Sequence, residues 1–205
     1  MTTNQLTLDD ILDARAYERV RDDFRRQVMA RKRLRRVPVG AIMTLVFESV
    51  DTVRFQVQEM ARVEKIFTDE GIQGELDVYN RLLPAPGELS ATLFIELTTE
   101  ADLRHWLPRL VGVERSVMFV LADGSEVASV PEASHADALT REAITPAVHY
   151  LRFPFAPEQV AAFADGPVIL AVAHAEYRHE VELAYGTRAA LLGDLEGRTE
   201  PLLLQ

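Results

Sequence analysis

Apolar residues recur every three or four positions along the first 36 residues, and charged residues fill the positions between them. The apolar positions are Tyr17, Val20, Phe24 and Val28. Leu8 followed by Asp9 has the pattern of a hydrophobic staple and an N-cap, and no proline interrupts the chain before Pro38. The pattern therefore predicts one long helix that begins at Asp9 and ends at about Arg36.

The next 60 residues predict a strand, two helices and a second strand. Residues 41–48 form a short apolar run rich in strand-forming residues. Residues 51–67 admit an alternating strand, but the spacing of their apolar positions favours a helix capped by Asp51, and residues 68–83 repeat that spacing. Pro84 ends this second helix, and residues 89–97 alternate like a strand.

The second half of the chain is rich in short strands. Strands are expected at 116–121, 125–130, 146–153, 167–174 and 179–184, with helices starting at Thr99 and Pro157 and a third at 187–195. Helices and strands do not alternate regularly, which predicts an α+β fold with a long N-terminal helix, a helical hairpin and a mixed or antiparallel sheet. We expect a helical arm at 1–36, a body at 37–195 with a subdivision near 131–143, and a tail at 196–205.

The composition excludes several classes of protein. The chain has 205 residues and no cysteine, which rules out disulfides, thiolate metal sites and a protein-ligated iron–sulfur cluster. No apolar run reaches the roughly 20 residues of a membrane span, and the N-terminus lacks the pattern of a secretory signal. These features predict a cytoplasmic protein that makes no use of the membrane.

The formal net charge of −10 is unevenly distributed. The densest cationic run is Arg31, Lys32, Arg33, Arg35 and Arg36. Such a run is typical of a contact to nucleic acid or to an acidic partner, but cations are also favoured at a helix C-terminus. We prefer the second interpretation and do not expect nucleic-acid binding, because no nucleic-acid motif accompanies the run and the rest of the chain is acidic.

Four glutamates stand where apolar residues are expected. On a helical wheel, Glu64 falls among the apolar positions of the first hairpin helix and Glu75 among those of the second. Glu48 and Glu96 share strand faces with residues that would point at one another if the two strands were neighbours. Buried carboxylates need a cation, a metal or a proton, so the four predict a carboxylate-rich site.

The occupant of that site is open at the level of sequence. Residues 40–98 contain no histidine, so a hard divalent ion such as Mg²⁺ or Mn²⁺ suits it better than a di-iron centre. Glu59, Arg62 and Tyr79 on the same predicted helices complete the candidate ligand set. The alternative, which we rank higher, is a structural ion-pair network with nearby arginines.

Histidines supply a weaker candidate site. His149, His174 and His179 lie on predicted strands, with His174 placed to face His179 across a hairpin, but their spacing matches no defined metal motif. The chain also lacks a glycine-rich phosphate loop, a G-x-S-x-G elbow and an H-E-x-x-H motif. No catalytic residue is assigned, and the sequence leaves open whether the protein is an enzyme, which cofactor it uses and whether it is a homo-oligomer.

Several segments resemble an uncharacterised bacterial family, a domain of unknown function of about this length. They are RRVPVG (35–40), TVRFQVQEMARVEKI (52–66), ELDVYNRLLP (75–84), GELSATLFIEL (87–97) and HYLRFPF (149–155). The resemblance extends to HAEY (174–177), where Ala175 stands in place of the proline common in the family. Members are typically encoded beside a rubrerythrin-like protein and an iron–sulfur oxidoreductase, which implies an accessory role with a redox partner and supplies no catalytic residues.

Overall fold

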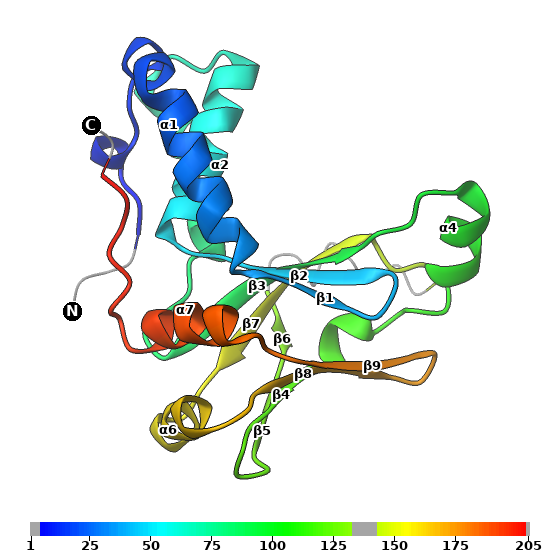
Figure 1. Ribbon diagram of the computed structural model, residues 1–205. Helices are drawn as coiled ribbons and strands as arrows, with labels where there is room; N and C mark the ends of the chain where they lie inside the picture. The colour runs from blue at the N-terminus through cyan, green and yellow to red at the C-terminus, as the bar shows by residue number, and fades with distance from the viewer. Residues whose placement is uncertain (1–4, 133–142, 204–205) are drawn as a thin grey trace.

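The computed structural model describes residues 5–132 and 143–203 and has the expected α+β fold (Figure 1). Its strands pair antiparallel in two sheets. The five-stranded sheet has the order β1 (Arg36–Val39), β2 (Met43–Phe47), β3 (Glu88–Ile95), β7 (Val148–Pro154), β6 (Val130–Pro131). The four-stranded sheet has the order β5 (Glu126–Ala128), β4 (Val117–Val120), β8 (Ile169–His174), β9 (Tyr177–Glu182).

The main hydrophobic core lies between the two sheets. Alternating strand residues of both sheets turn apolar side chains inward, as period-two patterning requires. The aromatic rings of Phe47 and Phe153 both contact Phe119 of the opposite sheet, with ring centroids 5.7 and 4.9 Å from it. The inner face of the five-stranded sheet is therefore fully used by the core.

Three helices cover part of the other face of the five-stranded sheet. They are α1 (Ala14–Arg33), α2 (Val50–Glu64) and α3 (Asp69–Tyr79), and we call them the helical layer (Figure 1). Two small apolar clusters hold this layer together, one between α1 and α2 and one between α2, α3 and the chain before α1. The remaining helices are α4 (Glu100–Trp106), α6 (Pro157–Asp165) and α7 (Tyr185–Leu195), with 3-10 turns at Leu8–Asp10, Asn80–Leu82 and Val113–Arg115.

Local capping explains where the helices start. Asp13, and not Asp9, caps α1, because its side chain accepts hydrogen bonds from the amides of residues 15 and 16. Ser49 takes the capping position of α2, so Asp51 lies inside the first turn and is buried. Thr99 caps α4 as its spacing predicts.

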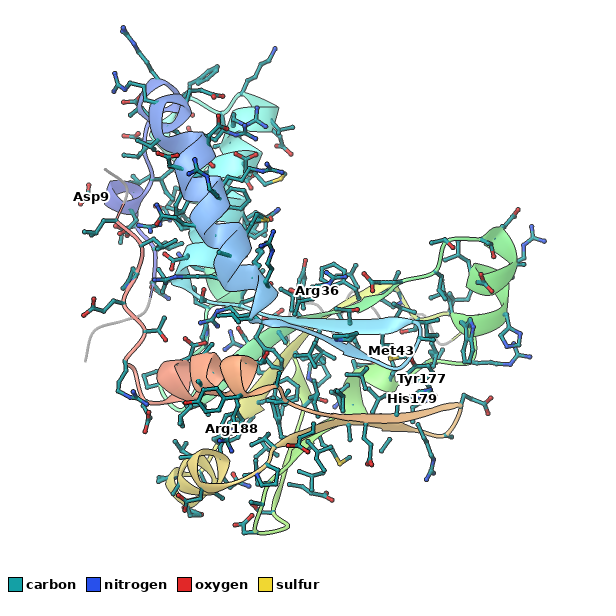
Figure 2. The ribbon with its side chains drawn as sticks, viewed as in Figure 1. Asp9, Arg36, Met43, Tyr177, His179 and Arg188 are labelled. Carbon is teal, nitrogen blue, oxygen red and sulfur yellow. The ribbon has the colours of Figure 1, made fainter. Side chains whose placement is uncertain are left out.

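Strand β1 was not predicted, because Pro38 looked like a terminator. The strand lies at the edge of the sheet, where a proline that cannot donate to a neighbour is tolerated. The hairpin that follows it turns at Gly40, whose φ of +73° favours glycine. The Tyr177 hydroxyl donates to the Val39 carbonyl at 2.9 Å and accepts from the Ile42 amide at 3.2 Å, so it fixes this hairpin onto the second sheet (Figure 2).

The segment after α7 packs along the helical layer. The Leu202 amide donates to Asp51 at 2.9 Å, and the Leu202 carbonyl accepts from Arg54. The boundary expected near 131–143 falls mostly on residues 133–142, which lie outside the described residues. Over the described ranges, none of the helices combines the length and the apolar character that crossing a membrane requires.

Candidate ligand pocket

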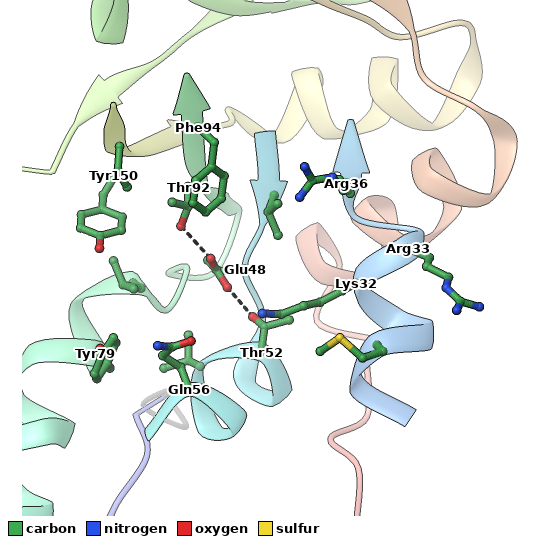
Figure 3. A pocket seen from close by; sticks show the side chains of 15 residues that line it. Lys32, Arg33, Arg36, Glu48, Thr52, Gln56, Tyr79, Thr92, Phe94 and Tyr150 are labelled. Atoms are coloured by element: carbon green, nitrogen blue, oxygen red, sulfur yellow. Dashed lines mark hydrogen bonds between the residues drawn. The ribbon is translucent and has the colours of Figure 1, made fainter. Parts of the chain in front are cut away.

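A pocket of about 680 Å³ lies between the helical layer and the outer face of the five-stranded sheet (Figure 3). Its floor is a row of side chains from four adjacent strands, because Arg36 pairs with Val46, Val46 with Thr92, and Thr92 with Tyr150. With strands about 4.8 Å apart, this row spans about 14 Å. The end of α1, the first turns of α2 and the end of α3 form the walls.

Glu48 projects its carboxylate into this pocket (Figure 3). It lies in the two-residue connection between β2 and α2, so the fold places it where sheet and helix meet. The Thr52 hydroxyl of α2 donates to one carboxylate oxygen at 2.6 Å, and the Thr92 hydroxyl of β3 donates to the other at 2.7 Å. Two neutral donors from different elements therefore hold the carboxylate in a fixed orientation.

Three other shielded carboxylates of the described chain are paired with arginine. Asp51 contacts two arginines, Asp194 forms a two-pronged pair with Arg35, and Glu88 contacts Arg152. Glu48 differs, because the described residues offer it no ion pair within 4.0 Å, although it faces the same protein interior. A carboxylate has about four lone-pair positions, so two threonine hydroxyls leave acceptor capacity for a ligand.

Aromatic side chains line the far half of the pocket. Tyr79 from α3, Tyr150 from β7 and Phe94 from β3 all contribute to its walls (Figure 3). Burial raises the pKa of the Tyr150 hydroxyl, and Tyr79 and the negative charge of Glu48 raise it further. This phenol therefore stays protonated at neutral pH, next to a carboxylate that favours donors.

Cationic side chains line the near half of the pocket. Lys32 extends into it from the last turn of α1, Arg33 lies at its rim and Arg36 at the end of the floor row (Figure 3). Arg36 is ion-paired with Glu96, so two cations, Lys32 and Arg33, stand against the one carboxylate of Glu48 and make this pocket electropositive in a protein whose net charge is negative.

The predicted cationic run is thus divided among different roles. Arg35 is buried against Asp194 of α7, and Arg31 contacts Asp51 and the Glu200 carbonyl. Arg36 also contacts Glu96. Lys32 extends into the pocket, whereas Arg33 lies at its rim with its side chain turned away from Glu48 (Figure 3), so the run does not form one continuous basic surface.

The predicted group of four glutamates is not brought together. Strands β2 and β3 are neighbours, which meets the condition for convergence, but they are antiparallel, so Glu48 and Glu96 lie at opposite ends of the pair. The Glu48 amide bonds to the Ser90 carbonyl and the Glu96 amide to the Ile42 carbonyl, six residues apart on each strand, which corresponds to about 20 Å.

The two helical glutamates lie at the other end of the helical layer. Glu64 is the exposed last residue of α2, and the partly buried Glu75 is near enough for the charge of Glu64 to raise its pKa, after the larger effect of burial. No group of three or more histidine, aspartate or glutamate side chains in the described ranges is placed to hold a metal ion.

Glu59 and Arg62 belong to an ion-pair network on the side of α2 that faces α1. The Glu59 carboxylate accepts from Arg21 at 2.7 and 2.9 Å, from the Tyr17 hydroxyl at 2.8 Å, and from Arg62 at 3.3 and 3.4 Å. These donors, the arginine first, lower the pKa of Glu59 to about 2. The role of this network is to fasten α1 to α2.

The three histidines are distributed over both sheets. His149 is buried on β7, where its Nε2 lies 3.1 Å from the Thr145 hydroxyl and its Nδ1 3.9 Å from Glu114. His174 and His179 lie on the other sheet. We expected His174 to face His179, but the tight hairpin pairs His174 with Tyr177 instead. The His179 ring instead packs on Tyr177, with centroids 4.4 Å apart (Figure 2).

Four pocket residues with polar side chains were not singled out from the sequence as site candidates: Thr52, Gln56, Thr92 and Tyr150. Alternation on the two central strands carried part of the signal. Thr92 and Tyr150 fall on the polar face of strands whose other face is apolar, and a polar face next to a helical hairpin indicates a cavity or a wet interface.

The chain matches the family model described as a protein of unknown function (DUF3501) over residues 5–195. It is also similar to a crystal structure of a novel protein of unknown function from Burkholderia pseudomallei K96243, with 37% sequence identity and a TM-score of 0.85. That similarity covers 93% of this chain and 99% of the other. No curated protein matches the chain. The match over nearly the whole chain shows that this protein belongs to the DUF3501 family.

Proposed function

We propose that this protein is a binding protein that captures a small organic molecule in the pocket beneath the helical layer. The observation that carries the proposal is the state of Glu48, a carboxylate oriented by Thr52 and Thr92 and without an ionic partner among the residues that the structure describes. A fixed acceptor in a cavity of this size, with aromatic and apolar walls, is the usual arrangement of a ligand site.

Structural roles account less well for this carboxylate. A carboxylate needed only for stability is expected to carry an arginine, as Glu59 and Asp194 do. Instead, the two threonines preorganise Glu48, which lowers the cost of fixing it when a donor group arrives.

A thermal-shift screen with a mixed library of organic acids, amines, sugars and nucleotides tests the proposal. Gln56→Trp fills the pocket from the partly exposed side of α2, and Gln73→Trp places the same residue on exposed α3 as a matched control. We expect at least one compound to raise the melting temperature of the wild type and of the control but not of Gln56→Trp. A screen in which no compound shows this dependence refutes the proposal.

A second candidate function is the accessory role that the family resemblance implies, with a rubrerythrin-like protein or an iron–sulfur oxidoreductase as partner. Val63 and Phe67, at the end of α2 and just beyond it, favour a docking surface because 63% and 73% of their surface is exposed. Co-purification of these two named partners with the tagged chain is the test. The accessory role is supported if a partner is recovered with the wild type and with the control Tyr185→Ser but not with Phe67→Ser. Failure to recover either partner counts against it.

The other two sequence hypotheses gain less support. A carboxylate metal site would need Glu48, Glu64, Glu75 and Glu96 to converge, and they lie at three separate places. Nucleic-acid binding would need a continuous cationic surface, and Arg31 and Arg35 are engaged with carboxylates.

A further inference from the structure

We infer that the ligand of this pocket is a mononucleotide, bound with its phosphate at the cationic end and an N–H edge of its base on Glu48. The inference rests on the proposed function and specifies the ligand class. It follows from the order of chemical groups along the floor of the pocket.

The cationic end fits a phosphate. Arg33 is exposed in the last turn of α1, and within the part of the chain that the structure describes its side chain makes neither a hydrogen bond nor an ion pair. Lys32 extends into the same end, and Arg36 closes the floor row there (Figure 3). Lysine and arginine side chains in and around an open cavity are the usual recognition elements for phosphate oxygens.

The middle of the pocket fits the polar edge of a base. An ionised carboxylate accepts hydrogen bonds and donates none, so its partner on a ligand must carry N–H or O–H groups. Bases that present a ring N–H or an exocyclic amino group can donate to one or both oxygens of Glu48. Thr52 and Thr92 keep that carboxylate from rotating toward the cations.

The far end fits a planar ring. Tyr79, Tyr150 and Phe94 surround it, and base-on-aromatic contacts are favourable for every base. The floor row of about 14 Å separates the cations from these rings, a length that suits a phosphate, a sugar and a base in sequence.

Size decides between a mononucleotide and a smaller zwitterion. An amino acid also carries an anionic and a cationic end, but it is too short to extend along the floor row of about 14 Å from Arg36 to Tyr150. The volume of about 680 Å³ lies within the range of pockets that enclose ligands of nucleotide size.

Isothermal titration calorimetry with AMP, GMP, CMP and UMP, their nucleosides and inorganic phosphate tests the inference. We expect at least one mononucleotide to bind at least about tenfold more tightly than its own nucleoside and than inorganic phosphate, because both ends contribute. Glu48→Gln is expected to weaken that binding by about ten- to a hundredfold, and Arg33→Gln to weaken it less and to reduce its salt dependence.

Glu182→Gln and Arg178→Gln, on exposed positions of β9, are the matched controls and should bind like the wild type. Circular dichroism establishes that each variant is folded, and Gln56→Trp provides an independent block of the pocket. The inference is overturned if no mononucleotide binds, if a nucleoside binds as well as its nucleotide, or if Glu48→Gln binds like Glu182→Gln. If a different compound from the library still binds in a Gln56-dependent manner, the proposed function stands and only the ligand class is wrong.

Discussion

The pairing of α1 with α2 should depend on pH through one carboxylate, Glu59. It accepts a two-pronged hydrogen bond from Arg21, a hydrogen bond from Tyr17 and a longer pair from Arg62, and 19% of its side chain is exposed. Glu59→Gln retains the shape of the side chain and removes its charge, so it mimics the protonated state of the wild type. The comparison of the two proteins therefore isolates the charge.

The structure sets the size of the effect. Folding lowers the pKa of Glu59 from 4.5 to about 2, so the folded state favours the ionised form and its contribution to stability is fully present above the unfolded pKa. At 1.36 kcal/mol for each unit, the charge contributes about 3 kcal/mol at pH 7. The same linkage relation leaves about 1 kcal/mol at pH 3 and almost nothing below pH 2.

Urea unfolding at pH 7, 5, 4 and 3 measures this contribution directly. The free energy of unfolding of the wild type should exceed that of Glu59→Gln by about 2 kcal/mol more at pH 7 than at pH 3. Glu182→Gln, at an exposed position of β9, should show no such trend. A difference between wild type and Glu59→Gln that stays constant over this range would refute the assignment of Glu59 as an ionised clasp between the two helices.

Three further substitutions test other contacts. Arg35→Met should lower the free energy of unfolding by about 3–5 kcal/mol because it leaves buried Asp194 uncompensated, and adding Asp194→Leu should recover most of the loss in urea unfolding. Glu75→Gln should raise the free energy of unfolding at pH 7 by less than about 1 kcal/mol, because the raised pKa of Glu75 means that the fold disfavours its charge. The gain should disappear in acid, where the wild-type carboxyl group is neutral. Gly40→Ala should destabilise the protein by more than about 1 kcal/mol, since φ is +73° and a Cβ would lie 2.2 Å from the phenol oxygen of buried Tyr177. Gly74→Ala is the control: it lies in open space on α3 and should not lower the melting temperature.

Helical and strand periodicity predicted most of the elements, but it misplaced side chains at the end of a helix that its neighbours do not cover. The helical wheel placed Glu64 on an apolar face with Val53 and Val57, and those two valines are indeed buried. The helix ends at Glu64, however, and Lys65 takes a left-handed conformation. Phe67 lies beyond the end of the helix and is exposed. Periodicity gives the direction of a side chain along a helix but not how far the neighbouring element covers it.

The candidate site was predicted in part for a related reason. Alternation placed Glu48 on one face of the first strand and Thr92 with Glu96 on one face of the later strand. The wheel and the strand pattern, however, carry no information on whether the two strands pair or in which direction they run. An antiparallel pair puts Glu96 at the far end and brings Thr92 to Glu48 instead. Tyr150 entered the same row only through the pairing of β3 with β7, between which 52 residues of chain intervene.

The arginines of this protein separate structural carboxylates from the one we assign to binding. Asp51, Glu59 and Asp194 each lie where two distant segments meet, and each is neutralised by arginine, which offsets the cost of burying the charge. Glu48 also lies at such a junction, yet among the described residues two threonine hydroxyls hold it and no arginine pairs with it, while Lys32 extends into the same cavity (Figure 3). A carboxylate that is oriented without an arginine, in a cavity that a lysine also enters, has the charge distribution of a site that is completed by a ligand with both a donor edge and an anionic group.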